Sequence, residues 1–123
     1  MASNDNLAGE FIARCFHART AAHILHLKSK SYAEHKALNK FYDSIIDLID
    51  DFAEMYQGEH STIIGSYPDG YRTPSSPLVL ISGLQSWIEN NRKNICDSQQ
   101  CQAQIDVILM LCNQTFYKLK FLK

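Results

Sequence analysis

Residues 31–56 read SYAEHKALNKFYDSIIDLIDDFAEMY, and the spacing of their apolar side chains predicts one long amphipathic helix. The main stripe recurs every three or four residues, at Leu38, Phe41, Ile45, Leu48, Phe52 and Met55. Tyr42, Ile49 and Tyr56 widen this stripe. Ser31 with Glu34 three residues later has the pattern of a capping box, and Gly58 favours a helix end. The predicted helix therefore covers residues 32–57.

Three further segments have the same helical period. The segment 7–28 has its apolar residues at Leu7, Phe11, Cys15, Ala18, Ala22 and Leu25. The segment 77–95 follows Ser76, an N-cap residue, and begins with Pro77 at the first helical position. The segment 98–121 has its stripe at Cys101, Ile105, Ile108, Cys112, Phe116 and Leu119. Strand signals are almost absent, so the sequence predicts an all-α fold.

The lengths of the connections predict the topology. The first two helices have a tight joint, and so do the last two, so each pair is expected to form an antiparallel hairpin. Residues 58–75 lack a helical pattern and could span about 60 Å if extended, whereas each helix is only about 35 Å long. We therefore predict a single domain over residues 1–123, a four-helix bundle with one long crossover loop, as in ferritin-like folds.

Composition and charge exclude several classes of protein. Hydrophobic residues make up 46% of the chain and the net charge is −1, so no global field favours nucleic acid or an anionic membrane. The polar N-terminus, Met1 to Asn6, lacks the regions of a signal peptide, and no apolar run reaches membrane-spanning length. We therefore expect a cytoplasmic protein without nucleic-acid or membrane partners.

The four cysteines and the absence of nucleophile motifs limit the kinds of reaction that the protein could catalyse. Cys15 and Cys112 lie on apolar stripes, and the spacing of Cys96 and Cys101 is not that of a CxxC site. We expect reduced thiols, as is usual in the cytoplasm, with a disulfide or zinc site as the alternative. No Gly-x-Ser-x-Gly or phosphate-binding loop is present, which argues against nucleophilic catalysis.

Four residues are candidate metal ligands. His26 and His35 lie at the margins of the first two apolar stripes, and Asp50 and Glu54 share one helix face. The alternatives are hydrogen-bonded core histidines and a solvated acidic face. His35 and Glu54 are about 28 Å apart along one helix, so they could bind one metal only if two copies packed this helix antiparallel. The Glu-x-x-His pairs of di-iron bundles are absent.

The stretch His26-Leu27-Lys28, Glu34-His35-Lys36-Ala37-Leu38, Phe41-Tyr42-Asp43 and Asp50-Asp51-Phe52-Ala53-Glu54 resembles Dps, the DNA-binding mini-ferritin of starved bacteria. The resemblance implies an iron site between subunits, with His26 and His35 from one chain and Asp50 and Glu54 from the other. Asn39 stands where Dps has an aspartate, and no basic DNA-binding tail is present at the N-terminus. The same stretch is similar to a group of small tailed-phage proteins, which would place the chain in the host cytoplasm.

Two functions remain open at this point. The first is a Dps-like helical homo-oligomer with a degenerate inter-subunit iron site, with or without ferroxidase activity. The second is a non-catalytic binding or regulatory protein that acts on a host or virion partner through its helical surface and the loop 58–75. In the second case Tyr67 and Tyr71 are the expected partner-binding residues.

Overall fold

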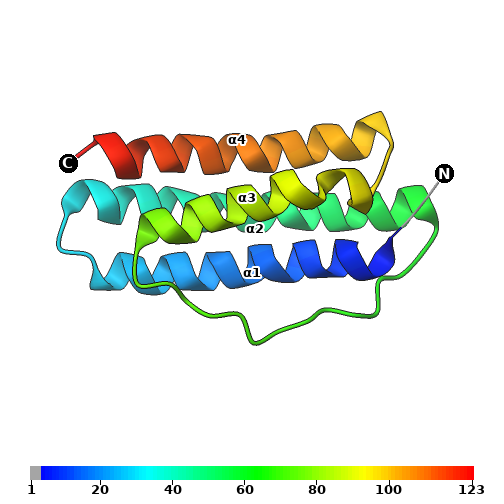
Figure 1. Ribbon diagram of the computed structural model, residues 1–123, viewed down its shortest axis with the longest axis horizontal. Coiled ribbons are helices and arrows are strands. Elements are labelled where there is room, and N and C mark those ends of the chain that lie inside the picture. Colours follow the sequence, from blue (N-terminus) through cyan, green and yellow to red (C-terminus); the bar gives the residue numbers. More distant parts are fainter. Residues whose placement is uncertain (1–3) are drawn as a thin grey trace.

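The computed structural model describes residues 4–123, and within this range it contains four helices and no strand. The helices are α1 (Asp5–Lys28), α2 (Tyr32–His60), α3 (Pro77–Ile95) and α4 (Gln99–Phe121), shown in Figure 1. The predicted all-α, four-helix fold is therefore confirmed. No helix in residues 4–123 is both long enough and apolar enough to cross a membrane.

Two predicted helix boundaries move, each for a local reason. α1 begins at Asp5 rather than at residue 7, because the Asn4 side chain accepts a hydrogen bond from the Leu7 amide at 3.2 Å. The prediction that Gly58 ends the second helix is wrong, since α2 continues to His60. The His60 ring packs on Tyr56 one turn earlier, with ring centres 4.2 Å apart, and this contact outweighs the poor helix propensity of glycine. Ser61, with a φ of 52°, then ends the helix.

Serine side chains cap the other three helices. Ser31, Ser76 and Ser98 accept hydrogen bonds from backbone amides three residues later, at 3.2, 3.3 and 3.0 Å. The capping box predicted at Ser31 forms only in half. The Ser31 amide donates to the Ser29 hydroxyl at 3.2 Å rather than to the Glu34 carboxylate. The tight α1–α2 joint therefore supplies its own cap.

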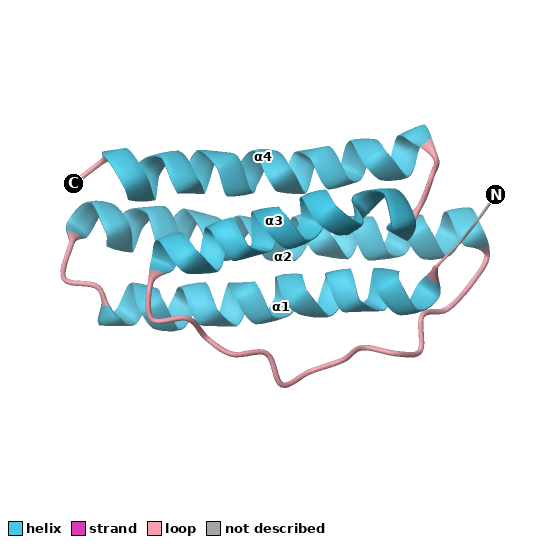
Figure 2. Ribbon diagram, viewed as in Figure 1, coloured by secondary structure: helices cyan, strands magenta, loops and turns pink. Residues whose placement is uncertain are grey.

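The four helices form a bundle in which each helix packs beside two others (Figures 1 and 2). α1 lies beside α2 and α3, and α4 lies beside α2 and α3. The chain direction reverses between α1 and α2 and between α3 and α4, so both predicted antiparallel hairpins are confirmed (Figure 1). α2 and α3 run in the same direction. The long connection from the end of α2 to the start of α3 therefore runs back along the length of the bundle (Figure 1).

The core draws on all four helices and centres on aromatic rings. Phe11 lies edge-to-face on Phe52 with ring centres 4.8 Å apart, and its other neighbour Trp87 stacks at 6.1 Å. The buried stripe of α2 is shifted from the predicted one: Ile49 and Tyr56 are fully buried, whereas Leu48 and Met55 are only partly so. A period of 3.6 residues rotates a seven-residue stripe by about 20° per repeat, which explains the shift.

The crossover connection lies along α1 and is held at both ends. Near its start, the Thr62 hydroxyl donates to the Asp5 carboxylate at 2.8 Å, and Ile64 is buried against the bundle. Near its end, the His17 ring shares a hydrogen bond with the Arg72 carbonyl oxygen at 2.9 Å. The loop is therefore packed on the bundle rather than free of it.

A disulfide links Cys96 and Cys101 across the α3–α4 joint, so the prediction that these two thiols are reduced is wrong. The turn between the helices brings the two Cα atoms to 6.4 Å, a distance that a disulfide can bridge. Gln102 donates to the Cys96 carbonyl oxygen at 2.8 Å and helps to hold this turn. Cys15 and Cys112 are free and buried, as predicted.

Candidate functional site

The two predicted metal-binding histidines meet where α1 ends and α2 begins. The rings of His26 and His35 stack with their centres 3.6 Å apart and their planes 23° from parallel. Nδ1 of His26 lies 2.9 Å from the His35 carbonyl oxygen, and Nδ1 of His35 lies 3.0 Å from the His26 carbonyl oxygen. The tight joint thus places two residues from different helices in one reciprocal contact.

This contact fixes which nitrogen of each ring carries a proton. A carbonyl oxygen only accepts hydrogen bonds, so both Nδ1 atoms must donate. In the neutral rings, both Nε2 atoms then carry a lone pair, and neither has a hydrogen-bond partner in the described part of the chain. Metal-binding histidines are commonly held in this way, with Nδ1 donating to a carbonyl and Nε2 facing the ion.

Two aromatic neighbours extend the histidine pair. The His23 ring stacks on Tyr42 with centres 4.1 Å apart, and Tyr42 meets His26 edge-on at 5.2 Å. Sequence reasoning did not select His23 as a site residue. Its signal was the spacing of three residues from His26, which places both on one helix face. Unlike the buried His26, His23 is exposed to solvent.

Asn39, where the resemblance to Dps implies an aspartate, forms hydrogen bonds with two neighbours on α2. Its side-chain oxygen accepts a hydrogen bond from the Tyr42 hydroxyl, and its amide donates to the Asp43 carboxylate at 3.3 Å. These bonds orient Tyr42 against the histidines. The amide therefore has a structural role and adds no negative charge to the site.

Asp50 and Glu54 are not brought to the histidines within one chain. Both are exposed on α2 and form no hydrogen bond or ion pair within residues 4–123. Glu54 is about 28 Å from His35 along the helix axis. In the described chain no three His, Cys, Asp or Glu side chains gather into a possible metal site. A single copy thus presents two separated halves of the predicted ligand set.

The two loop tyrosines differ in their surroundings. Tyr71 packs on α1, where the Arg14 guanidinium lies 4.7 Å from its ring centre and 4.9 Å from the ring of Trp87. Burial raises the pKa of Tyr71 above its usual value of 10.0, although the positive charge of Arg14 acts in the opposite direction. Tyr67 is 45% exposed. Tyr71 therefore helps to hold the loop, and Tyr67 is the more accessible of the two.

The free thiols do not form a catalytic centre. Burial raises the pKa of Cys15 well above its ordinary value, and burial raises the pKa of Cys112 to about 12. A thiol with so high a pKa stays protonated at neutral pH and is a poor nucleophile. Both cysteines serve as core residues.

Comparisons with known proteins give two matches. A model of a family of unknown function (DUF5856) matches residues 26–119, which include His26, His35, Asp50 and Glu54. Over 116 residues the chain is 29% identical to the "uncharacterized 14.6 kDa protein in mobD-ri intergenic region" of Enterobacteria phage T4. This match covers 94% of the chain and 86% of the T4 protein. No solved structure matches the chain. The similarity supports the expected link to phage proteins, and neither match is to a ferritin or a Dps protein.

Proposed function

Since the chain belongs to the DUF5856 family, a family of unknown function, we infer its function from its own residues. We propose that it is a helical oligomer that binds divalent metal ions between two copies. The ion that the resemblance to Dps favours is iron(II), which would be cargo rather than a resident cofactor. The similarity to a phage T4 protein supports a phage origin and, with it, action in the host cytoplasm.

The observation that carries the proposal is the reciprocal contact of His26 and His35. Each ring donates Nδ1–H to the backbone of the other residue and keeps an Nε2 lone pair for a metal ion. Two nearly parallel rings cannot both direct an in-plane lone pair at one ion. Each histidine would therefore hold its own ion, which makes the proposed centre a two-ion site.

A second copy would supply the carboxylates. Asp50 and Glu54 lie on α2 without a partner in the described chain, and both are exposed. Antiparallel pairing of two α2 helices would bring the C-terminal half of one α2 beside the start of the other. Carboxylate oxygens together with imidazole nitrogen suit iron and other divalent transition metals. Iron(II) bound there would supply redox chemistry, and the side chains of this chain would bind and orient it.

The bundle topology also supports a ferritin-like assignment within this proposal. The diagonal, parallel arrangement of α2 and α3 requires one crossover connection, as in ferritin-like bundles. Because Asn39 replaces a charged ligand and is bound to Tyr42 and Asp43, the site is weaker than that of Dps. The function proposed for this site is therefore metal binding.

The experiment is a calorimetric titration of the protein with iron(II) without oxygen, and with cobalt(II) as a spectroscopic substitute. Asp50→Asn together with Glu54→Gln should weaken binding roughly a hundredfold, as expected for loss of charged ligands. The matched control is Asp47→Asn with Asp51→Asn, which removes the same charge from exposed positions of the same helix. If both double variants weakened metal binding equally, the loss would come from the overall negative charge of α2, and the proposed site would be rejected.

Complementation tests whether two copies share the site. Co-expression of a His26→Ala/His35→Ala variant with the Asp50→Asn/Glu54→Gln variant should restore about a quarter of the binding sites, since about half of randomly formed pairs are mixed and each mixed pair has one intact site of two. Each variant alone should bind roughly a hundredfold more weakly than the unsubstituted protein. Absence of restoration in a mixed oligomer that native mass spectrometry confirms would contradict the proposal.

A second candidate is a non-catalytic binding protein that acts through the crossover loop. The observation that favours it is the exposure of Ile63 and Tyr67, 81% and 45% respectively, beside the packed Tyr71. Ile63→Ser with Tyr67→Ser should abolish capture of a host protein without lowering the melting temperature. The metal titration would be unchanged in this variant, which separates the two functions.

A further inference from the structure

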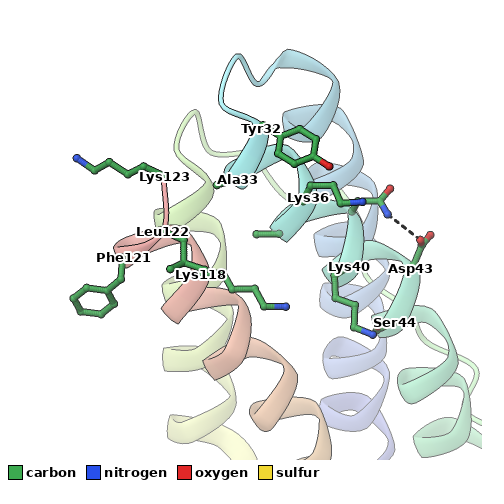
Figure 3. Close-up of a pocket in the computed structure, with 12 residues that line it drawn as sticks. Tyr32, Ala33, Lys36, Lys40, Asp43, Ser44, Lys118, Phe121, Leu122 and Lys123 are labelled. Atoms are coloured by element: carbon green, nitrogen blue, oxygen red, sulfur yellow. Dashed lines mark hydrogen bonds between the residues drawn. The ribbon is translucent and has the colours of Figure 1, made fainter.

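A groove of about 910 Å³ opens where the start of α2 lies beside the end of α4 (Figure 3). Two alanines of α2, Ala33 and Ala37, line it, and their small side chains leave room between the helices. Its volume is within the range of sites that bind ligands or peptide side chains. The groove lies apart from the crossover loop, none of whose residues line it.

Exposed apolar side chains surround the groove. Tyr32 is 77% exposed, Phe121 is 63% exposed and Leu122 is 47% exposed, and all three line it. Exposed large apolar residues are ordinary when scattered, but clustering at a concave surface indicates a binding site. The groove thus offers apolar contacts to an incoming side chain.

Lysines give the groove a positive charge. Lys36, Lys40 and Lys118 line it, and Figure 3 shows Lys118 reaching from α4 toward α2. None of the three forms an ion pair within residues 4–123. Asp43, an acidic residue in the lining, accepts a hydrogen bond from Asn39. The positive charge is therefore available to an acidic partner.

The rest of α2 limits how long that partner can be. Beyond the groove, the exposed face of α2 turns acidic. Its exposed carboxylates are those of Asp47, Asp50, Asp51, Glu54 and Glu59. A nucleic acid or an anionic membrane would extend from the lysines onto these carboxylates and be repelled. A short acidic segment would end before reaching them.

From these features we propose that the groove between α2 and α4 docks a short, acidic, amphipathic helix of a partner protein. An apolar side chain of that helix enters between Ala33 and Ala37, and its carboxylates pair with Lys36, Lys40 and Lys118. A helix lying in a groove between two helices is a common mode of peptide recognition. The groove shares Asn39 with the proposed metal site, but the lysines that would bind the partner take no part in that site.

The test uses a labelled, end-capped helical peptide of about 18 residues, with leucines on one face and glutamates beside them. Fluorescence anisotropy should show saturable binding that weakens with salt. Lys36→Glu with Lys40→Glu should weaken binding at least roughly tenfold, or about 1.4 kcal/mol. The matched control, Lys28→Glu with Lys30→Glu, reverses two exposed lysines outside the groove and should change the affinity less than about twofold.

Further variants keep the result specific. Ala33→Trp should block the groove without changing its charge and should also weaken binding, and circular dichroism checks that each variant is folded. Equal binding of a peptide with lysines in place of its glutamates would overturn the proposal. So would tighter, groove-dependent binding of single-stranded DNA or anionic vesicles. If Lys36→Glu/Lys40→Glu dissociates a homo-oligomer in sedimentation, the groove belongs to a second copy and the proposal fails.

Discussion

Gly9 and Ser66 touch through their backbones: a Cβ atom added to Gly9 would lie 2.0 Å from the Ser66 carbonyl oxygen. The crossover loop can therefore lie on α1 only because residue 9 has no side chain. A backbone atom cannot turn aside as the end of a flexible side chain can. Any larger residue at position 9 must push the loop outward or shift α1.

Gly9→Ala should destabilise the protein by about 1–3 kcal/mol, the range for overpacking a closely packed site. Urea unfolding measures the change. Gly83→Ala is the matched control, because a Cβ atom added to this glycine of α3 would have no neighbour within 4 Å and alanine favours helix. The control should gain up to about 1 kcal/mol. Equal effects at both positions would contradict the close contact.

The His26–His35 pair should behave as one unit in unfolding experiments. Replacing either histidine by alanine removes the ring stacking and one of the two reciprocal hydrogen bonds. A double-mutant cycle with His26→Ala and His35→Ala should give a coupling of about 0.5–3 kcal/mol. Additive losses would show that the rings do not support each other. His17→Ala gives, for comparison, the change in the free energy of unfolding when a histidine outside the pair is replaced.

Reduction of the Cys96–Cys101 disulfide should lower the free energy of unfolding by about 2 kcal/mol, as chain entropy predicts for so short a loop. The fold should persist, since Ser98 still caps α4 and Gln102 still bonds the turn. Denaturation with and without dithiothreitol measures the loss. Alkylation of the native, unreduced protein should label neither Cys15 nor Cys112, because both are buried.

Alkaline pH should weaken the fold through Cys112. Its pKa rises from 9.0 to about 12 on folding, so the unfolded chain releases this proton first as the pH increases. The contribution of the protonated Cys112 thiol to the free energy of unfolding is fully present below pH 9 and is lost as the pH rises toward 12. At pH 10 the loss contributed by Cys112 is about 1.4 kcal/mol relative to neutral pH, and the raised pKa of Cys15 adds to the total loss. Cys112→Ala should flatten this part of the stability profile, and an unchanged slope would contradict it.

Several features of the fold could be predicted because they depend on neighbours in sequence. The caps at Ser31 and Ser76 and the apolar stripes that include Phe11 in α1 and Ile45 in α2 depend on residues a few positions apart. The end of α2 could not be predicted in this way. There Gly58 suggested a stop, whereas the packing of Tyr56 on His60 continued the helix.

The candidate site divides in the same way. The histidines were identified from spacing and from the resemblance to Dps, but their reciprocal hydrogen bonds depend on the geometry of the joint between α1 and α2. The disulfide could not be predicted from the sequence, because the spacing of Cys96 and Cys101 does not match a known motif. Only the folded turn between α3 and α4 brings their Cα atoms close enough to be bridged.

The sequence by itself determined four helices, two hairpins and a crossover, since helical periodicity, caps and loop lengths are local properties of the chain. The tertiary structure alone decided that Gly9 meets Ser66 and that Arg14 lies against Tyr71 and Trp87. The tertiary structure also creates the groove between α2 and α4, which Lys36 and Lys118 line. These contacts join residues far apart in the chain, and their geometry depends on how the whole bundle packs.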